Sequence, residues 1–188
     1  TYGLRSYVAF AGGVAVEPVL GSRSTDLLSG LGPPPIVTGD VLPVGCGGAA
    51  LPAPGADVAR WQGPPAELVL PLLIGPRHDW FTPAALSDLA RARYTVASAS
   101  NRIGLRTDGP PLARRRTDEL PSEGMVSGAV QVPSDGRPVV FLADHPVTGG
   151  YPVIGVVPPE HLTAIAQARP GTPVRFVPTG PASRLTPG

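Results

Sequence analysis

The chain has 188 residues and a formal net charge of +1, and all fifteen of its basic residues are arginine. This near-neutral balance indicates neither a nucleic-acid-binding surface nor an anionic-membrane surface, and the lack of lysine excludes a catalytic lysine from this chain. The longest apolar run, residues 68–74, is far shorter than the roughly 20 residues that cross a bilayer. No signal peptide is visible and the single Cys46 cannot form an internal disulfide, so we expect a cytoplasmic protein.

Glycine and proline, with 24 and 26 residues, make up more than a quarter of the chain and separate short β-branched runs. This pattern is typical of an all-β protein with many turns. Strand-like sequence begins at once, at residues 4–10, behind a first residue that is not methionine. We therefore expect a fragment whose first part is missing. Residues 45–65 are the best linker candidate.

The predicted elements continue with an apolar run at 67–74, which Pro71 should reduce to an edge strand or to two short pieces. Thr82 is a suitable N-cap for a helix that begins at Pro83. Further strands are expected at 94–97, 103–107, 129–132, 139–142, 153–157 and 173–177, and a second helix at 159–168. Many strands joined by tight turns, with only two short helices, predict a mainly β barrel or sandwich rather than a βαβ series.

Polar side chains gather in the turns of the part of the chain that begins at residue 67. They lie in the stretches GPRHDWF, SNRIGLR, ELPSEG, GAVQVP and LADHPVTGGYP. Arginine offers a planar fork of donors that binds carboxylate or phosphate, and carboxylates can transfer protons. Two adjacent glycines allow backbone amides to approach a ligand closely. These residue types together suit a site for a small polar or anionic substrate.

Each of these features also has an ordinary structural explanation. Arg77 and Asp79 can form a local ion pair beside a helix start, and Asn101 can serve only to make a turn. Glu123 can be solvated, and the pair Gly149-Gly150 can be a plain hairpin turn. The arginine run at 114–116 is typical of a solvated face.

Several site classes are not supported by the residue spacing. The three histidines and the lone cysteine do not have the spacing of zinc ligands, so we expect no metal site. The chain also lacks the G-x-S-x-G elbow of serine hydrolases and the GxxxxGK[ST] motif of P-loop proteins.

Eight segments, in this order, resemble the KipA family. They are AGG (11–13), LGSRST (20–25), GDVLP (39–43), GPRHDWF (75–81), SNRIGLR (100–106), ELPSEG (119–124), GAVQVPSDGRP (128–138) and LADHPVTGGYPVIG (142–155). The family includes the C subunit of prokaryotic 5-oxoprolinase, proteins labelled allophanate hydrolase subunit 2, and the carboxyltransferase domain of urea amidolyase, with its subdomains A and B. The resemblance spans nearly the whole chain. Family members carry an additional N-terminal segment, which we expect to be the missing first part.

The resemblance implies a cyclophilin-like β-barrel at residues 66–178. Residues 1–62 would then be the C-terminal part of a first β subdomain with a linker, and 179–188 a disordered tail. It also implies a partner, a KipI-like B subunit, and a third protein, the A subunit. With them the chain would act as the C subunit of an ATP-dependent amidohydrolase that opens 5-oxo-L-proline to L-glutamate, with ATP bound in a site shared with a partner.

Two alternatives remain open. In the first, the chain is a carboxyltransferase module that moves a carboxyl group from carboxybiotin to urea or a related amide, and biotin is then the cofactor. In the second, it is a non-catalytic antagonist that binds a KipI-like kinase inhibitor. The substrate of both catalytic hypotheses is a small amide.

The resemblance also suggests roles for individual residues. Arg77 and Arg102 would bind the substrate carboxylate or the transferred phosphoryl group, and Glu123 or Asp144 would transfer protons or orient the amide. The amides of Gly149 and Gly150, with Thr148, would stabilise developing oxyanion charge. Further substrate-binding residues are expected at Asn101, Gln131 and Tyr151.

Overall fold

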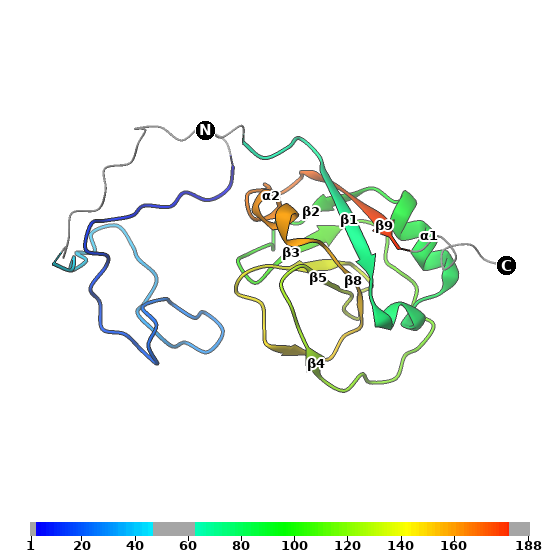
Figure 1. Cartoon of the computed structure of the whole chain (residues 1–188), viewed down its shortest axis with the longest axis horizontal. Helices are drawn as coiled ribbons and strands as arrows, with labels where there is room; N and C mark the ends of the chain where they lie inside the picture. Colours follow the sequence, from blue (N-terminus) through cyan, green and yellow to red (C-terminus); the bar gives the residue numbers. More distant parts are fainter. Residues whose placement is uncertain (1–2, 47–62, 181–188) are drawn as a thin grey trace. The chain divides into compact units, whose positions relative to one another are not determined.

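The computed structural model describes residues 3–46 and 63–180. The chain divides into two compact units, one formed by residues 1–5 with 62–188 and the other by 6–61. In the described part of the second unit, 6–46, pairing is limited to the isolated bridges Val14–Val44 and Val19–Ser22. Every described helix and strand therefore belongs to the first unit, which is called the barrel unit below (Figure 1).

Seven strands of the barrel unit form a closed barrel in the order β1-β8-β5-β6-β3-β2-β9. Their bounds are β1 Leu68–Ile74, β2 Tyr94–Val96, β3 Gly104–Asp108, β5 Ala129–Gln131, β6 Val139–Phe141, β8 Val153–Val156 and β9 Pro173–Thr179. The barrel closes where β1 and β9 pair in parallel, and the other neighbours are antiparallel. A separate two-stranded ribbon consists of β4 Glu123–Gly124 and β7 Thr148–Gly149.

The helices are short. They are the 3-10 helices η1 Pro76–Trp80 and η2 Pro159–His161 and the α-helices α1 Pro83–Arg91 and α2 Leu162–Ala166. Helix α1 begins as predicted, because the Thr82 hydroxyl accepts a hydrogen bond from the Ala85 amide at 3.1 Å and Pro83 takes the first helical position. None of the helices in the described ranges has the length and apolar character needed to span a membrane.

The predicted fold class, a mainly β barrel with two short helices, is confirmed. Each of the six strands predicted after residue 90 is present, with its ends shifted by two residues at most. The helix predicted at 159–168 is divided into η2 and α2, which end at Ala166. The turn residues and the short β-branched runs between them were therefore sufficient to place these elements.

One predicted strand was right in part and another was wrong. Strand β1 runs unbroken through Pro71, so it is not divided into two short pieces. It pairs with β9 at residues 68–73 but with β8 only at Leu73 and Ile74, so the part that holds Pro71 is an edge, as predicted. Pro71 thus lies outside the part that pairs with β8, and its missing amide removes no hydrogen bond on that side. The strand predicted at 4–10 does not form, since no described segment pairs with it.

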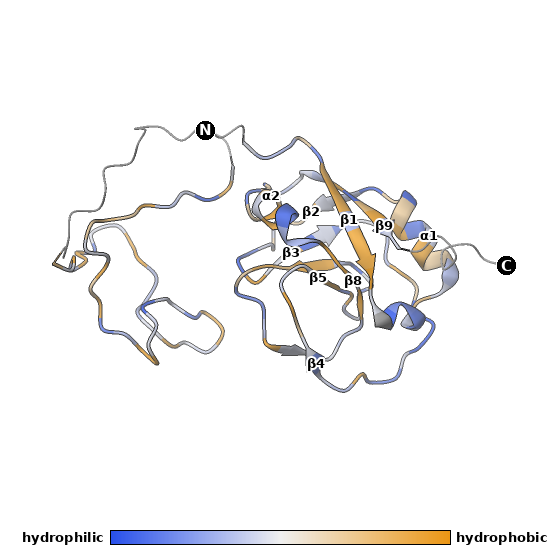
Figure 2. Ribbon diagram, viewed as in Figure 1, coloured by the Kyte–Doolittle hydropathy of each residue, from blue (hydrophilic) through white to orange (hydrophobic). Residues whose placement is uncertain are grey.

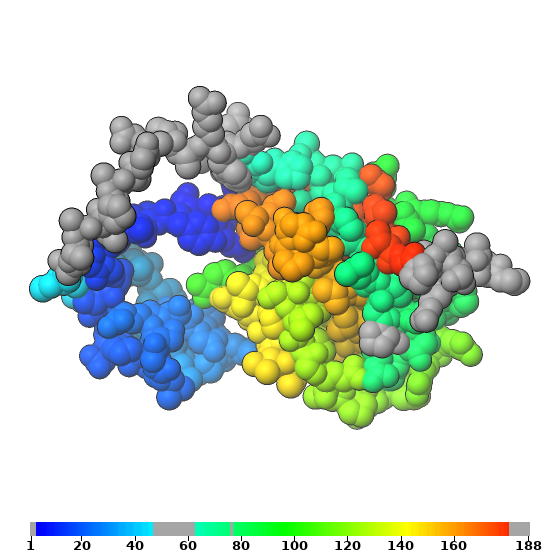
Figure 3. All heavy atoms as spheres, in the orientation of Figure 1, coloured from blue at the N-terminus to red at the C-terminus, as the bar shows by residue number. Residues whose placement is uncertain are grey.

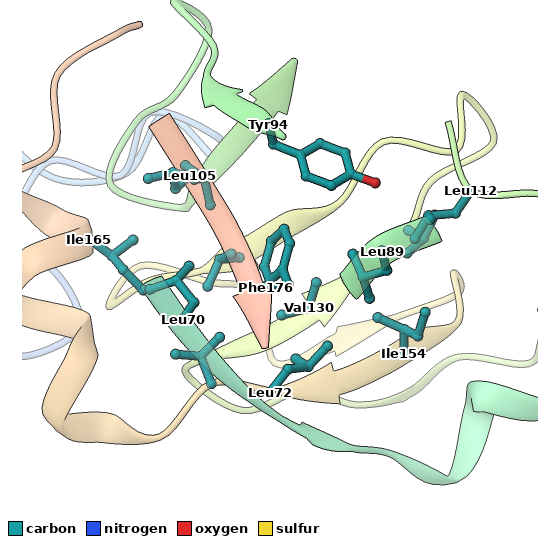
Figure 4. Packing of buried hydrophobic residues seen from close by; sticks show 14 of the residues in the cluster. Leu70, Leu72, Leu89, Tyr94, Leu105, Leu112, Val130, Ile154, Ile165 and Phe176 are labelled. Atoms are coloured by element: carbon teal, nitrogen blue, oxygen red, sulfur yellow. The ribbon is translucent and has the colours of Figure 1, made fainter. Parts of the chain in front are cut away.

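The barrel interior holds the main hydrophobic core. On β1 the buried residues alternate, so Leu68, Leu70 and Leu72 point inward, and Phe176 of β9 packs edge-on against Tyr94 of β2 at 5.6 Å between ring centroids. Figure 4 shows these side chains meeting others from β3, β5, β8 and α1. Strand β1 is hydrophobic along its length, whereas η1 after it is hydrophilic (Figure 2). The space-filling view shows the outer face of the barrel unit, on which the segment of η2 and α2 appears in orange (Figure 3).

A second, smaller hydrophobic cluster lies outside the barrel. It contains Met125, Ala129, Val139 and Phe141, with Val153 packed against it. Because side chains alternate along a strand, Val139 and Phe141 of β6 point to the opposite side from Val140, which belongs to the main core. The outer face of β6 is therefore also buried, and this face supports the candidate site.

Candidate functional site

A cavity of about 330 Å³ lies over the outer face of β3, β5 and β6. Its lining residues are Asn101, Ile103, Gly104, Arg106, Gln131, Pro133, Val139, Phe141 and Tyr151. The floor is apolar, and the groups around it are an arginine, two side-chain amides and a tyrosine. Such a combination can hold a small ligand with a compact apolar body and polar edges.

The strand register brings the polar lining residues together. Arg106 of β3 and Gln131 of β5 both stand opposite Val139 of β6, so the three residues form one row across the sheet. Neighbouring strands are about 4.8 Å apart, which places the backbones of Arg106 and Gln131 about 10 Å apart with Val139 between them. At Gly104 an added Cβ would lie 2.9 Å from Val139 Cγ1, so the glycine permits close packing of the floor.

The Asn101 side chain can shape a turn and bind a ligand at the same time. Its side-chain oxygen accepts hydrogen bonds from the backbone amides of Ile103 at 2.9 Å and Gly104 at 3.3 Å, which shapes the turn into β3. In the described part of the chain its amide nitrogen has no partner. The turn role and the site role of Asn101 are thus compatible, and the free nitrogen can donate to a ligand in the cavity.

Gln131 is a buried polar residue, with 7% of its surface exposed. Its amide nitrogen donates to the Tyr151 carbonyl at 3.3 Å and lies 4.0 Å from the sulfur of Met125. Gly149 of β7 packs closely against it, because an added Cβ there would be 2.7 Å from the Gln131 nitrogen. These contacts orient the side chain, and its carbonyl oxygen has no protein partner among the described residues. Gln131 can therefore accept a hydrogen bond from a ligand.

Tyr151 lines two cavities. One is the first cavity, and the other, of about 300 Å³, is also lined by Gly150, Trp80 and Arg114. The Arg114 guanidinium lies 5.7 Å from the centre of the Tyr151 ring and donates to the Val132 carbonyl. The Tyr151 ring is therefore supported from behind by a fixed cation.

Arg77 and Glu123 form an ion pair that joins η1 to the ribbon. The Arg77 Nε donates to both carboxylate oxygens, at 2.8 and 3.1 Å, and its terminal nitrogen contacts the same carboxylate. Hydrogen bonding and charge from Arg77 lower the pKa of Glu123 below its ordinary 4.5, and the pKa of Arg77 is raised in turn. Since the folded-state pKa of Glu123 is depressed, its stabilising effect is present above pH 4.5 and is lost as the pH falls further.

Arg102 and Asp144 form a second ion pair, with 2.9 Å between the Arg102 Nε and an Asp144 oxygen. The Asp144 amide also donates to the Arg102 carbonyl at 3.2 Å, so the segment after β6 is held against the turn that carries Asn101. Both side chains are about half exposed. Arg102 follows the lining residue Asn101 directly in the sequence, but neither Arg102 nor Asp144 lines the cavity.

The ten predicted site residues are thus distributed in three ways. Asn101, Gln131 and Tyr151 line the first cavity. The four predicted ionic residues form the two ion pairs. Of the remaining three, Gly149 packs on Gln131, Gly150 lines the second cavity, and Thr148 lies exposed in β7. The functional role of each of the ten stays a prediction.

Six of the nine lining residues had no role assigned from the sequence, and Arg106 and Phe141 are the largest of them. Arg106 was visible as the last residue of the motif SNRIGLR, but only the register of β3 against β6 places it at the cavity. Phe141 lies in the strand predicted at 139–142, and the structure places it in the second hydrophobic cluster, on the outer face. Within the described ranges, no group of three His, Cys, Asp or Glu residues could hold a metal ion.

The chain is similar to several known proteins over most of its length. It is 37% identical to the C subunit of 5-oxoprolinase from Escherichia coli strain K12 over 180 residues, which are 94% of this chain and 56% of that protein. It is 31% identical to the urea amidolyase of Lachancea kluyveri, covering 94% of this chain and 11% of that protein. The chain therefore spans about half the length of the bacterial relative and a small part of the yeast one.

A solved structure has the same fold. The crystal structure of the protein TTHA0988 superimposes with a TM-score of 0.75 at 37% identity, covering 94% of this chain and 34% of that one. The family model described as "Carboxyltransferase domain, subdomain A and B" matches residues 1–178, nearly the entire sequence. The chain belongs to the carboxyltransferase domain, subdomain A and B, family.

Proposed function

We propose that the chain acts as the C subunit of a 5-oxoprolinase-type amidohydrolase, in which the cavity over β3, β5 and β6 binds the cyclic amide 5-oxo-L-proline. The observation that carries this proposal is the pair of free hydrogen-bonding groups at the cavity. Asn101 offers an amide nitrogen that can donate, and Gln131 offers a carbonyl oxygen that can accept. The similarity to the C subunit of 5-oxoprolinase supports the same substrate.

A five-membered lactam fits these groups. Its ring holds the amide in the cis form, so the N–H donor and the C=O acceptor lie on one edge of the molecule. The C=O would accept from Asn101 and the N–H would donate to Gln131, while the methylene groups would contact Phe141 and Val139. Each polar group of the amide then has a partner, which an apolar floor alone could not supply.

The ionic residues would act mainly by positioning these groups. Glu123 stands opposite Gly149 in the ribbon, and Gly149 packs against Gln131, so the pair with Arg77 fixes the Gln131 side of the cavity. The pair between Arg102 and Asp144 fixes the Asn101 side. Proton transfer by Glu123 or Asp144, and oxyanion stabilisation by Thr148 with the two glycine amides, are further roles that we propose for these groups during ring opening.

The reaction would need partners. Water adds to the lactam carbonyl, the C–N bond breaks and the released amine takes up a proton, and ATP hydrolysis drives this opening of a stable amide. We propose that ATP binds in a site shared with a KipI-like B subunit, that an A subunit completes the enzyme, and that the complex is cytoplasmic.

A second function is favoured by the family description and by the urea amidolyase relative. In that case the same free amide groups would bind urea, and a carboxyl group would be transferred to it from carboxybiotin. Urea also has donors and an acceptor on neighbouring atoms, so the groups of Asn101 and Gln131 suit it as well.

Reconstitution separates the two functions. The protein is co-purified at full length with the A and B subunits, and glutamate release from 5-oxo-L-proline is measured with and without ATP. We expect ATP-dependent release that falls about 100-fold in Asn101→Ala, whereas Asp135→Ala, an exposed change away from the first cavity, retains it. Urea carboxylation without glutamate release would refute the proposal in favour of the carboxyltransferase. Binding of a KipI-like protein with neither activity would favour the regulatory alternative.

A further inference from the structure

The arginines near the cavity differ in whether their guanidinium groups are already paired. Arg77 is paired with Glu123, Arg102 with Asp144, and Arg137 with Asp108. Arg106 lines the cavity, and its guanidinium has no hydrogen-bond or ion-pair partner in the described part of the chain. Among the described residues it is also the only arginine that lines this cavity.

We propose that Arg106 is the carboxylate-binding residue of the cavity and thereby selects amide substrates that carry a carboxylate over uncharged ones. This inference rests on the proposed function for the identity of the amide, and it assigns to Arg106 a role that the sequence had suggested for Arg77 and Arg102. A guanidinium can bind a carboxylate through two parallel hydrogen bonds, and an arginine already paired with an acidic residue must first give up that partner.

The backbone at Arg106 is held firmly in place. The Ser100 hydroxyl accepts from the Arg106 amide at 3.0 Å and donates to the Arg106 carbonyl at 3.2 Å. The Ala97 amide donates to the same carbonyl at 2.9 Å, and the residue pairs with Val139 on the other side. An unpaired arginine on a protein surface is ordinarily only solvated. Arg106 differs because its strand position is fixed and its side chain borders a cavity with oriented amide groups.

The spacing in the row Arg106–Val139–Gln131 matches the two ends of the proposed substrate. Gln131 and Asn101 would hold the lactam edge, and an arginine side chain is long enough to reach over Val139 from a backbone about 10 Å away from that of Gln131. The carboxylate on the neighbouring ring carbon would then meet the guanidinium. Urea has no such group, so binding of urea would gain nothing from Arg106.

Three probes separate the carboxylate from the lactam. They are 5-oxo-L-proline, which has both groups, 2-pyrrolidinone, which has only the lactam, and cyclopentanecarboxylate, which has only the carboxylate. Binding to the full chain is measured by NMR titration for the wild type, for Arg106→Gln, and for the matched control Arg137→Gln, which removes an equal charge from an exposed arginine that does not line this cavity.

We expect Arg106→Gln to weaken binding of both carboxylates by about 10- to 100-fold, as for the loss of a charge-assisted hydrogen-bonded pair, and to leave 2-pyrrolidinone binding unchanged. Arg137→Gln should change none of the three affinities by more than about 2-fold. Unchanged carboxylate binding in Arg106→Gln, an equal loss for all three probes, or no binding of either carboxylate to the wild type would each overturn the inference.

The reconstitution assay can refute the proposed function without refuting the role of Arg106. If the carboxylates bind in an Arg106-dependent manner and the reconstituted complex still releases no glutamate from 5-oxo-L-proline, the anion-binding role of Arg106 stands and the assignment of the substrate is wrong.

Discussion

Single residues in this protein differ in how completely their polar groups are satisfied. Tyr94 is 1% exposed and packs against Phe176 in the core, yet its hydroxyl has no hydrogen-bond partner among the described residues. Burial, together with the charge of Asp88, raises the pKa of Tyr94 from 10.0 to about 12. A buried hydroxyl without a partner is a cost to folding, because water hydrogen-bonds it in the unfolded chain.

Tyr94→Phe should therefore stabilise the protein. The ring and its packing remain, and removing the unsatisfied hydroxyl should raise the free energy of unfolding by about 1 kcal/mol at pH 7, measured by urea denaturation. The control is Tyr7→Phe, at a residue that is 82% exposed, and it should change the free energy of unfolding by less than about 0.5 kcal/mol.

The same variant has a predicted pH dependence. The folded-state pKa of Tyr94 is raised, so the wild type loses stability as the pH rises from 10 towards 12, while Tyr94→Phe has no group to ionise there. The stability difference between the variant and the wild type should thus widen above pH 10. An equal alkaline loss in both proteins would show that Tyr94 does not titrate as its burial implies.

At the scale of elements, the ribbon of β4 and β7 connects an ion pair to the cavity. Glu123 of β4 is held by Arg77 and stands opposite Gly149 of β7, whose backbone packs against the Gln131 amide. The glycine is needed for this approach, since any side chain would meet the Gln131 nitrogen. The ribbon therefore sets the position of Gln131 although it contributes no lining residue itself.

Gly149→Ala should displace Gln131 and weaken substrate binding. The added Cβ would lie 2.7 Å from the Gln131 nitrogen, and this flexible amide can move, so the fold should persist. We expect the KM of the reconstituted enzyme for 5-oxo-L-proline to rise about 10-fold with kcat nearly unchanged, because ground-state and transition-state binding weaken together.

The matched control lies in the same ribbon. Gly124→Ala adds a methyl group where no atom comes within 4 Å, so it should leave the KM unchanged. Equal KM values for the two variants would mean that Gln131 does not contact the substrate.

At the scale of the whole barrel unit, closure depends on close approach of β1 to β8. Gly155 stands opposite Ile74 of β1 and Val130 of β5, and an added Cβ would lie 2.5 Å from the Leu73 carbonyl oxygen and 2.8 Å from Leu72 Cγ. Backbone atoms cannot move aside as a flexible side chain can, and the core beneath is closely packed.

Gly155→Ala should therefore lower the free energy of unfolding by about 1 to 3 kcal/mol, as overpacked core positions do. Urea denaturation measures the change, with Gly124→Ala as a variant of equal composition that should lose less than about 1 kcal/mol. A normal midpoint for Gly155→Ala would show that β1 and β8 can separate without cost.

Much of the fold was predictable because its determinants are local. The N-cap at Thr82, the proline after it and the β-branched runs between turns act within a few residues of themselves, and the corresponding helix and strands are present. The strand at 4–10 was not predictable in the same way, because a strand also needs a partner, which its own residues do not encode. The form of β1 was not predictable from its own residues either, because it depends on which part of the strand pairs with β8.

The candidate site was predictable only in its residue types. The sequence by itself determined the β-rich class, the family resemblance, and a supply of arginines, carboxylates and amides in the turns. Only the tertiary structure decided that Arg77 and Arg102 are paired with carboxylates, while Arg106 has no such partner between residues 3–46 and 63–180, and that Gln131 and Arg106 share a row. The physical reason is that ion pairing and register depend on contacts between segments far apart in the chain, whereas the turns and helix caps that the sequence specifies are formed by neighbours.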